Sequence, residues 1–310
     1  MEEIAKCKEL KAIYADDKAM LAGPKTIKFD IEDNRIHISI FQMSFREIVI
    51  SSDEDVAVNE LHGAFSKVER LLMLFEGSFL QLQELEFSKS DISSEATLKA
   101  HQDNSIRQRL SYFNSDRFVN YKRDTLLDFD KVLTSEIYSK WKILLEELDI
   151  VHQMYLYALS NNKIPVDVKC SFMIELAEPL VEIVNENTGF FASLTPGGRN
   201  TSLKMCIDAL ITKYGTEIFK RELSGGYDFF LESLVASRVR IMHIKRKQKK
   251  LFFDGNESRL YMYKLSLLYR RIMFELLGVN EEDYKERLSN CVCKADQWND
   301  VLEHFLLKKK

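Results

Sequence analysis

The chain has 310 residues and a formal net charge of -4 at pH 7. This length predicts two domains rather than one. The slightly acidic balance excludes a protein that is coated with nucleic acid over its whole surface, so any RNA contact must be local. No apolar run approaches the roughly 18 residues of a membrane span, and the first residues lack the apolar core of a secretion signal. We therefore expect a cytoplasmic protein without membrane contact.

The first third of the chain combines strand and helix patterns. Polar and apolar residues alternate at residues 35–40, and β-branched residues end the segment 46–50, so both segments are predicted strands. Apolar residues three or four positions apart predict a helix at 56–75, and a period of two predicts a strand at 79–87. Residues 88–103 are rich in Ser, Asp, Glu and Thr, which is typical of a linker.

From Lys131 onward the pattern is helical nearly throughout. We predict helices at residues 135–161, 167–186, 203–219, 229–243, 259–277 and 281–307. Pro179 should kink or split the second helix, and Asn200 or Thr201 should cap the third. The predicted fold class is therefore α+β, with a mixed α/β domain at residues 1–127, sensory or regulatory in role, followed by an all-α domain at residues 128–310.

The most distinctive segment of the chain is basic. Seven Lys or Arg residues fall between Arg238 and Lys250, and no acid occurs from Ser233 to Phe253. Arg238 occupies a step of an apolar helical stripe where a hydrophobic residue is expected. A permanent cation there needs a partner, and one candidate is a phosphate held at a subunit interface. His243 follows five positions later and can titrate near neutral pH.

Arg238 and His243, with four residues between them at the end of an amphipathic helix, resemble the active-site motif of HEPN domains. A loop with Asp254-Gly255-Asn256 and a long apolar helix closed by Gly278 follow, an order that is similar to the Apea-like branch of these proteins. The resemblance covers residues from about 128 to 279. It implies an all-α HEPN-like bundle that forms a homodimer. It also implies a metal-independent endoribonuclease of stress response or anti-phage defence, with a 2′,3′-cyclic phosphate as the product.

Residue types assign the roles within this motif. His243 is the expected proton-transfer group, and Arg238 is the expected phosphate clamp. One domain supplies one such histidine, so a symmetric dimer through the helical domain would complete an acid and base pair. No cofactor and no metal are expected, because Cys291, Cys293 and His304 lack a fourth ligand. The expected RNA-binding residues are Arg240, Lys245, Arg246, Lys247, Lys249 and Lys250.

Val239 leaves a different function open. Most catalytic HEPN motifs have a polar residue directly after the arginine, and this chain has valine. The alternative is a non-catalytic module that binds RNA or dimerises. Cations at a helix C-terminus also complement the helix dipole, so the basic segment could be a solvated helix end. Docking on anionic lipid is less favoured, because the helix carries its charges at one end and has no Trp.

Overall fold

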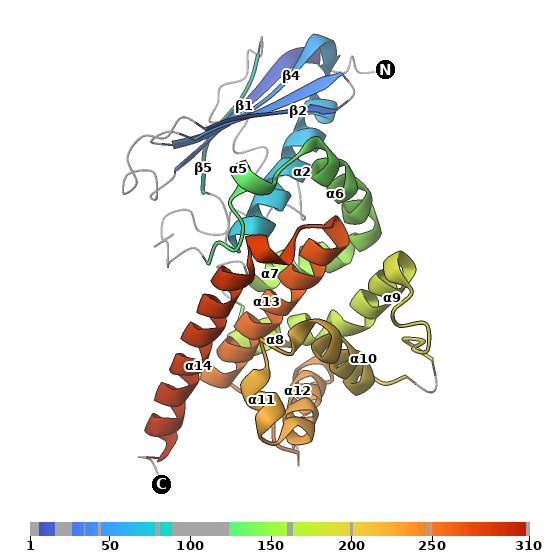
Figure 1. Ribbon diagram of the computed structural model, residues 1–310, viewed down its shortest axis with the longest axis vertical. Coiled ribbons are helices and arrows are strands. Elements are labelled where there is room, and N and C mark those ends of the chain that lie inside the picture. The colour runs from blue at the N-terminus through green and yellow to red at the C-terminus, as the bar shows by residue number, and fades with distance from the viewer. Residues whose placement is uncertain are drawn as a thin grey trace. The chain divides into compact units, whose positions relative to one another are not determined.

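The protein has an α+β fold in which an antiparallel sheet precedes a helical region (Figure 1). The computed structural model describes residues 6–15, 27–33, 35–42, 45–77, 81–88, 124–159, 164–198, 201–245, 247 and 250–307. The chain divides into two compact units, Met1–Glu146 and Glu147–Lys310. The boundary expected between residues 127 and 128 therefore lies within the first unit. The predicted linker lies outside the described residues from residue 89 onward.

The described strands form one five-stranded antiparallel sheet with the order β2-β3-β4-β1-β5. The structure confirms the strands predicted at 35–40, 46–50 and 79–87, and it adds two strands that were not predicted, β1 and β2. The bounds are β1 (Lys6–Ala15), β2 (Ile27–Asp33), β3 (Ile36–Gln42), β4 (Phe45–Ala57) and β5 (Gln81–Phe87).

Every second side chain of β3 and of the first half of β4 is buried. Ile38 pairs with Ile50 and Ile40 pairs with Ile48, so these four residues lie on one face of the sheet. The helix predicted at 56–75 is confirmed as α2 (Val58–Glu76), which contacts β4 and β1. Val58, the first apolar position of this pattern, is half-buried, and the other apolar positions are buried, namely Leu61, Phe65, Val68, Leu71, Leu72 and Phe75.

The helix α6 (Ser135–Leu148) packs into the core of the first unit. Trp141 is fully buried, and its indole N–H donates to the carbonyl of Lys67 on α2 at 2.8 Å. Lys142 pairs with Asp33 of β2. Before α6, the short helix α5 (Phe129–Val132) follows Leu126, whose N–H donates to the carbonyl of Phe75 at 3.0 Å. These contacts place residues 128–146 in the first unit instead of the predicted helical domain.

The described residues of the second unit contain helices and no strands. The helix predicted at 135–161 is two helices, because Asp149 adopts a left-handed backbone (φ 35°) between α6 and α7 (Ile150–Leu159). The split expected in the second helix is confirmed, with α8 (Val166–Glu175) and α9 (Ala177–Thr188) meeting at Leu176. Pro179 lies in the first turn of α9. The N–H groups of a first turn have no carbonyl partner within the helix, so a proline costs no hydrogen bond there.

The remaining helices follow the predicted order with local differences. The helix predicted at 203–219 is α10 (Leu203–Leu210) continued by the π-helical turn η2 (Ile211–Gly215). Ser202 caps α10 in place of Asn200 or Thr201, since its hydroxyl accepts from the N–H of Met205 at 3.3 Å. The other elements are α11 (Lys220–Ser224), which was not predicted, α12 (Tyr227–Met242), α13 (Asn256–Leu277), η3 (Glu281–Asp283) and α14 (Lys285–Leu307).

The start of α12 is joined to α10 by a polar contact. The hydroxyl of Tyr227 donates to a carboxylate oxygen of Asp208 at 2.8 Å. Burial, with Asp208 next, raises the pKa of the Tyr227 phenol, so this hydroxyl remains a donor at neutral pH. In the part of the chain that the structure describes, no helix is both long and apolar enough to cross a membrane.

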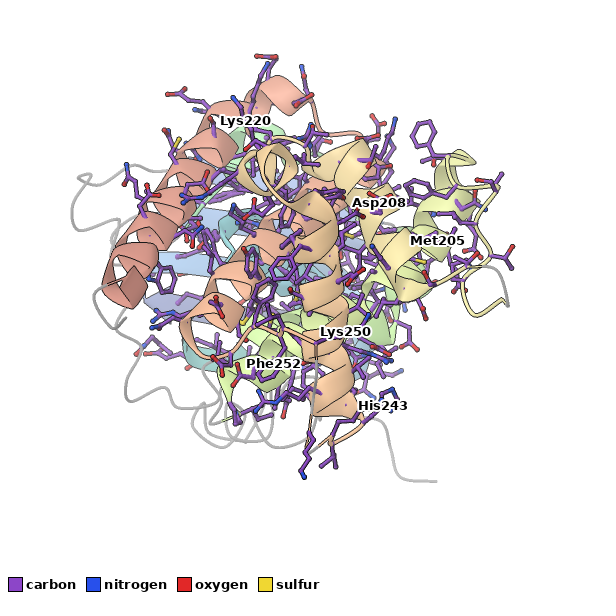
Figure 2. All side chains as sticks on the ribbon, turned by 90° about the horizontal axis from the view of Figure 1, so that it is seen from below. Met205, Asp208, Lys220, His243, Lys250 and Phe252 are labelled. Atoms are coloured by element: carbon purple, nitrogen blue, oxygen red, sulfur yellow. The ribbon has the colours of Figure 1, made fainter. Side chains whose placement is uncertain are left out.

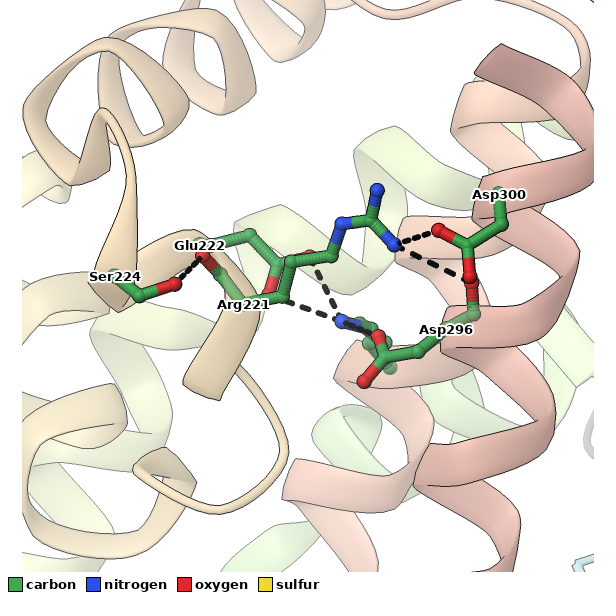
Figure 3. Close-up of polar contacts among 6 residues, drawn as sticks. Arg221, Glu222, Ser224, Asp296 and Asp300 are labelled. Carbon is green, nitrogen blue, oxygen red and sulfur yellow. Dashed lines mark hydrogen bonds and ion pairs between the residues drawn. The ribbon is translucent and has the colours of Figure 1, made fainter. Parts of the chain in front are cut away.

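A buried lysine connects three helices of the second unit (Figure 3). The ammonium of Lys264 on α13 lies 2.8 and 3.0 Å from the carboxylate oxygens of Glu222 on α11. It also lies 2.8 Å from the carboxylate of Asp296 on α14. The neighbouring Arg221 reaches Asp300, one turn further along α14. Because a buried charge is costly unless it is paired, Lys264 fixes α11 and α14 against α13.

We expect Glu222→Gln to lower the free energy of unfolding by about 3 kcal/mol, because it leaves a buried ammonium with one carboxylate instead of two. Urea denaturation of the full chain measures this loss. The triple variant Lys264→Met with Glu222→Leu and Asp296→Leu should recover most of it, since apolar side chains that replace every member of a buried ionic group often do so at little cost. A loss well below 1 kcal/mol for Glu222→Gln would contradict this role.

Candidate functional site

Arg238 meets Glu175 and His243 where α12 ends. Arg238 lies in the last turns of α12, and Glu175 is the last residue of α8. The guanidinium binds the carboxylate as a fork, with Nη2 2.7 Å from Oε1 and Nε donating to Oε2. Its third nitrogen, Nη1, lies 3.1 Å from Nε2 of His243. The structure therefore brings the two predicted catalytic residues together and adds an acid to them.

The sequence predicted that Arg238 needs a partner and named a phosphate as one candidate. In the structure, the partner of Arg238 within the chain is Glu175. The hydrogen bond from Arg238 to Glu175 raises the pKa of the guanidinium, which is therefore a permanent cation. The Arg238 side chain is still 20% exposed. A guanidinium carries five N–H donors in all, so N–H groups of Nη1 and Nη2 remain available to a ligand.

The contact with Arg238 defines the state of the His243 ring. A guanidinium has donors only, so Nε2 of His243 must be the acceptor. The tautomer that fits this contact carries its ring proton on Nδ1. The His243 side chain is also exposed. An exposed neutral imidazole can take a proton from a substrate.

The backbone after α12 turns sharply and positions His243. The N–H of Lys245 donates to the carbonyl of Arg240 at 3.0 Å, and the N–H of Ile244 donates to that of Ile241 at 3.3 Å. This pair of bonds is a Schellman motif, which requires a left-handed residue that is usually glycine. Ile244 occupies that position with a φ of 49°. A β-branched residue is strained there, and the strain lies directly beside His243.

The loop after the motif is anchored at its far end. The buried hydroxyl of Ser237 donates to the carbonyl of Ser233 and accepts from the N–H of Phe253, both at 2.7 Å. The N–H of Gly255 donates to Asp167 of α8 at 2.8 Å, with Gly255 in a conformation of positive φ (53°) that favours glycine. These bonds fix the return of the chain towards α13.

Four of the six predicted RNA-binding residues are described, and they lie at different places along α12 and beyond its end. Arg240 stacks on the ring of Phe252, with 4.0 Å from the guanidinium carbon to the ring centroid. Lys245 and Lys247 are exposed beyond the helix end. Lys250 lies 3.9 Å from Glu232 and beside the middle of α12, whereas His243 lies at its end (Figure 2). Arg246 and Lys249 lie outside the described residues.

Sequence reasoning missed Glu175, Ser237 and Phe252. Arg238 could have pointed to Glu175, because a cation on the apolar stripe of a helix implies an acidic partner on a helix that packs against it. Sequence patterns do not identify which acid takes that place. Ser237 and Phe252 fall inside the motif segment, but their polar and ring contacts depend on how the loop returns to α12.

The two cysteines considered as metal ligands lie on α14. Cys291 is buried and Cys293 is exposed, so the two thiols lie on different faces of the helix. The side chain of His304 lies outside the described residues. Among the residues with a described placement, no three His, Cys, Asp or Glu side chains gather in a way that could hold a metal ion.

Comparisons of the chain with models of protein families, with curated proteins and with solved structures find no match. The function of the site is therefore inferred from its residues and their geometry.

We expect Ile244→Gly to raise the free energy of unfolding by about 0.5–1 kcal/mol. Relief of the left-handed strain, about 1–2 kcal/mol, should exceed the entropy cost of glycine. Because Ile244 is 84% exposed in the single chain, little packing within the chain is lost. Denaturation at two protein concentrations separates this effect from any loss at the dimer contact proposed below, since only the latter depends on concentration. The control Val239→Gly, inside α12, should lower stability by about 1 kcal/mol. Chemical denaturation of both variants measures the two changes in the free energy of unfolding, which should have opposite signs. A lower free energy of unfolding for Ile244→Gly would contradict the backbone strain at this position.

Proposed function

We propose that this protein is a metal-independent endoribonuclease of the HEPN type that acts as an effector in stress response or anti-phage defence. The observation that carries the proposal is the 3.1 Å contact between Arg238 and His243, with Glu175 fixing the guanidinium. A proton-transfer group and a phosphate-binding group thus lie side by side at an exposed helix end. The resemblance of the surrounding segment to HEPN domains supports the same function.

The proposed reaction is an internal transesterification of RNA. A scissile phosphate binds the N–H groups of Arg238 and displaces His243 from Nη1. Nε2 of His243 then takes the proton of the 2′-hydroxyl while O2′ bonds to phosphorus and the bond from phosphorus to O5′ breaks. Arg238 stabilises the charge that develops on the phosphoryl oxygens. The products are a 2′,3′-cyclic phosphate and a 5′-hydroxyl, once O5′ has received a proton.

A second copy of the chain supplies the proton to O5′. One histidine cannot act as base and acid at the same moment, and a twofold axis beside α12 would bring in the partner's equivalent site. Two large apolar side chains at this helix end are exposed, Met242 at 40% and Ile244 at 84%, and Leu251 in the returning loop is 67% exposed. Exposed apolar residues beside a polar site support a protein interface there.

The RNA backbone is held mainly by charge. Arg240, Lys245, Arg246, Lys247, Lys249 and Lys250 form a local basic segment in a chain of net charge -4. Such contacts neutralise phosphates and release counterions without reading the sequence. The 4.0 Å stacking of Arg240 on Phe252 orients one guanidinium and places an aromatic ring where a base can stack.

A second candidate function is a non-catalytic module that binds RNA or dimerises. The Glu175 carboxylate neutralises Arg238, which also gives the arginine a purely structural role. Val239, in place of the usual polar residue, favours the same alternative. RNA cleavage by the purified protein separates the two candidates, because only the first requires turnover.

We expect His243→Ala and Arg238→Ala each to abolish detectable RNA cleavage. Loss of the proton-transfer group should cost about 10²–10⁴-fold in rate, and loss of the phosphate clamp about 10²–10³-fold. EDTA should leave the rate unchanged, because the proposed groups supply both proton transfer and charge stabilisation. Gel analysis of RNA 5′-labelled fragments measures cleavage, and circular dichroism verifies the fold.

The matched control is the double variant Lys249→Ala with Lys250→Ala. It should retain the chemistry, bind RNA less tightly and show a flatter dependence of affinity on salt, because these residues contribute counterion release alone. Cleavage by a folded His243→Ala protein would refute the assigned base. If the wild type cleaves no RNA, with or without an activating partner, the catalytic function is excluded and the non-catalytic binding module remains.

We expect the protein to be a homodimer through its helical unit. The double variant Ile244→Glu with Leu251→Glu should yield monomers and lose cleavage, because two charges enter the proposed apolar contact. Light scattering at micromolar concentration gives the mass. Exposed Ile143→Glu, far along the chain from the motif, is the control and should stay dimeric. A strictly monomeric wild type that cleaves RNA would exclude the composite site.

A further inference from the structure

A cavity of about 580 Å³ lies within the first unit, apart from any residue of the motif. Its walls come from the end of β2 and the start of β3, from the N-terminal half of α2, and from α6. Pockets for small molecules typically measure roughly 300–1,000 Å³. The cavity therefore has room for a small organic molecule.

Two ion pairs frame the cavity and hold its three walls. Arg35 binds Glu60 of α2 as a fork, with 3.0 Å from Nε to Oε1 and 2.6 Å from Nη2 to Oε2. Lys142 of α6 pairs with Asp33 at the end of β2. The hydrogen bond to Arg35 lowers the pKa of the Glu60 carboxyl, which is ionised at neutral pH. These four charges cancel one another.

Lys67 adds a positive charge that the walls do not balance. It lines the cavity from α2, and none of the carboxylates with a described position lies within ion-pair distance of its ammonium. Its backbone carbonyl accepts from Trp141, which fixes this turn of α2 without using the side chain. The lining thus carries three cations and two carboxylates, and an anion is the ligand that balances them.

Apart from the polar Asn59, the rest of the wall is formed by Gly63, Ala64, Ile36 and Tyr138. Gly63 lies in the middle of α2, where glycine is a poor helix former, and a Cβ atom added to it would meet nothing within 4 Å. Ala64, Ile36 and the ring of Tyr138 complete this side. Burial, with Asp33 next, raises the pKa of the Tyr138 phenol, so this wall stays uncharged.

We propose that this cavity binds a small organic anion, with one phosphate or carboxylate group at Lys67 and a planar or apolar body against Gly63, Ile36 and Tyr138. The site belongs to the first unit alone and is independent of the proposed RNA chemistry.

Isothermal titration calorimetry of the full chain tests the proposal with phenyl phosphate, benzoate and the neutral benzyl alcohol. We expect at least one of the two anions to bind with a Kd of about 1 mM or tighter, and benzyl alcohol to bind at least about tenfold more weakly. The anion that binds more tightly identifies the preferred acidic group. Lys67→Ala should weaken its binding about tenfold, because a charged contact is lost.

Gly63→Leu separates binding from stability. Leucine favours the helix, so the unliganded variant should have a higher Tm than the wild type, yet its side chain should fill the cavity and block the anion. Lys140→Ala is the control, since Lys140 lies on α6 outside the cavity and pairs with Glu136. Binding of neither anion, or equal binding by wild type, Lys67→Ala and Gly63→Leu, would overturn the proposal.

Discussion

The ion pair between Glu175 and Arg238 is the constraint on which the motif region depends. Two helices, α8 and α12, end at this point, and each helix end carries a partial negative charge from its last carbonyl groups. Glu175 adds a full negative charge to that place. The guanidinium therefore compensates a carboxylate and two helix ends at once, which explains why an arginine tolerates a position on an apolar stripe. Removing the cation would leave the converging ends of the helices to repel one another. Because the fork fixes the orientation of the guanidinium, it also determines where His243 can be held.

Arg238 therefore has a structural duty and a proposed chemical one, and the two use different nitrogen atoms. Nε and one N–H of Nη2 face Glu175, whereas Nη1 faces His243. The fork to Glu175 orients the guanidinium before a substrate arrives, which is what electrostatic catalysis requires. The basic segment beyond it is arranged differently. Its described lysines, Lys245, Lys247 and Lys250, are exposed, and Lys250 lies near the middle of α12. In the proposed function, charge attraction would therefore act over the length of the helix, while proton transfer would take place only at its end.

Local patterns in the sequence predicted much of the fold, and long-range contacts account for what they missed. Strands β3 to β5 and helices α2, α12 and α13 follow periods that are visible in a few neighbouring residues. Strand β1 is rich in Lys, Glu, Leu and Ala, which favour helices, and it is a strand because β4 and β5 pair with it on both sides. The break at Asp149 depends on one backbone angle. The boundary between the units follows Glu146 instead of residue 127, because α6 packs on α2. Its Trp141 donates to the carbonyl of Lys67, 74 positions earlier in the chain. The acid that meets Arg238 is set by the packing of α8 on α12, which no spacing within the motif encodes.

The central position of β1 in the sheet has a consequence during protein synthesis. β1 is the first described strand to leave the ribosome, yet one of its two neighbours, β5, is the last strand of the sheet to be made. Roughly 70 residues separate the ends of these strands, which at about 5–20 residues per second corresponds to about 4–14 s of translation. β4 emerges earlier and can cover one edge of β1, but the other edge keeps its N–H and C=O groups unpaired until β5 arrives. During those seconds the nascent sheet exposes a strand edge to other chains, so chaperone supply and translation rate should govern the yield of folded protein.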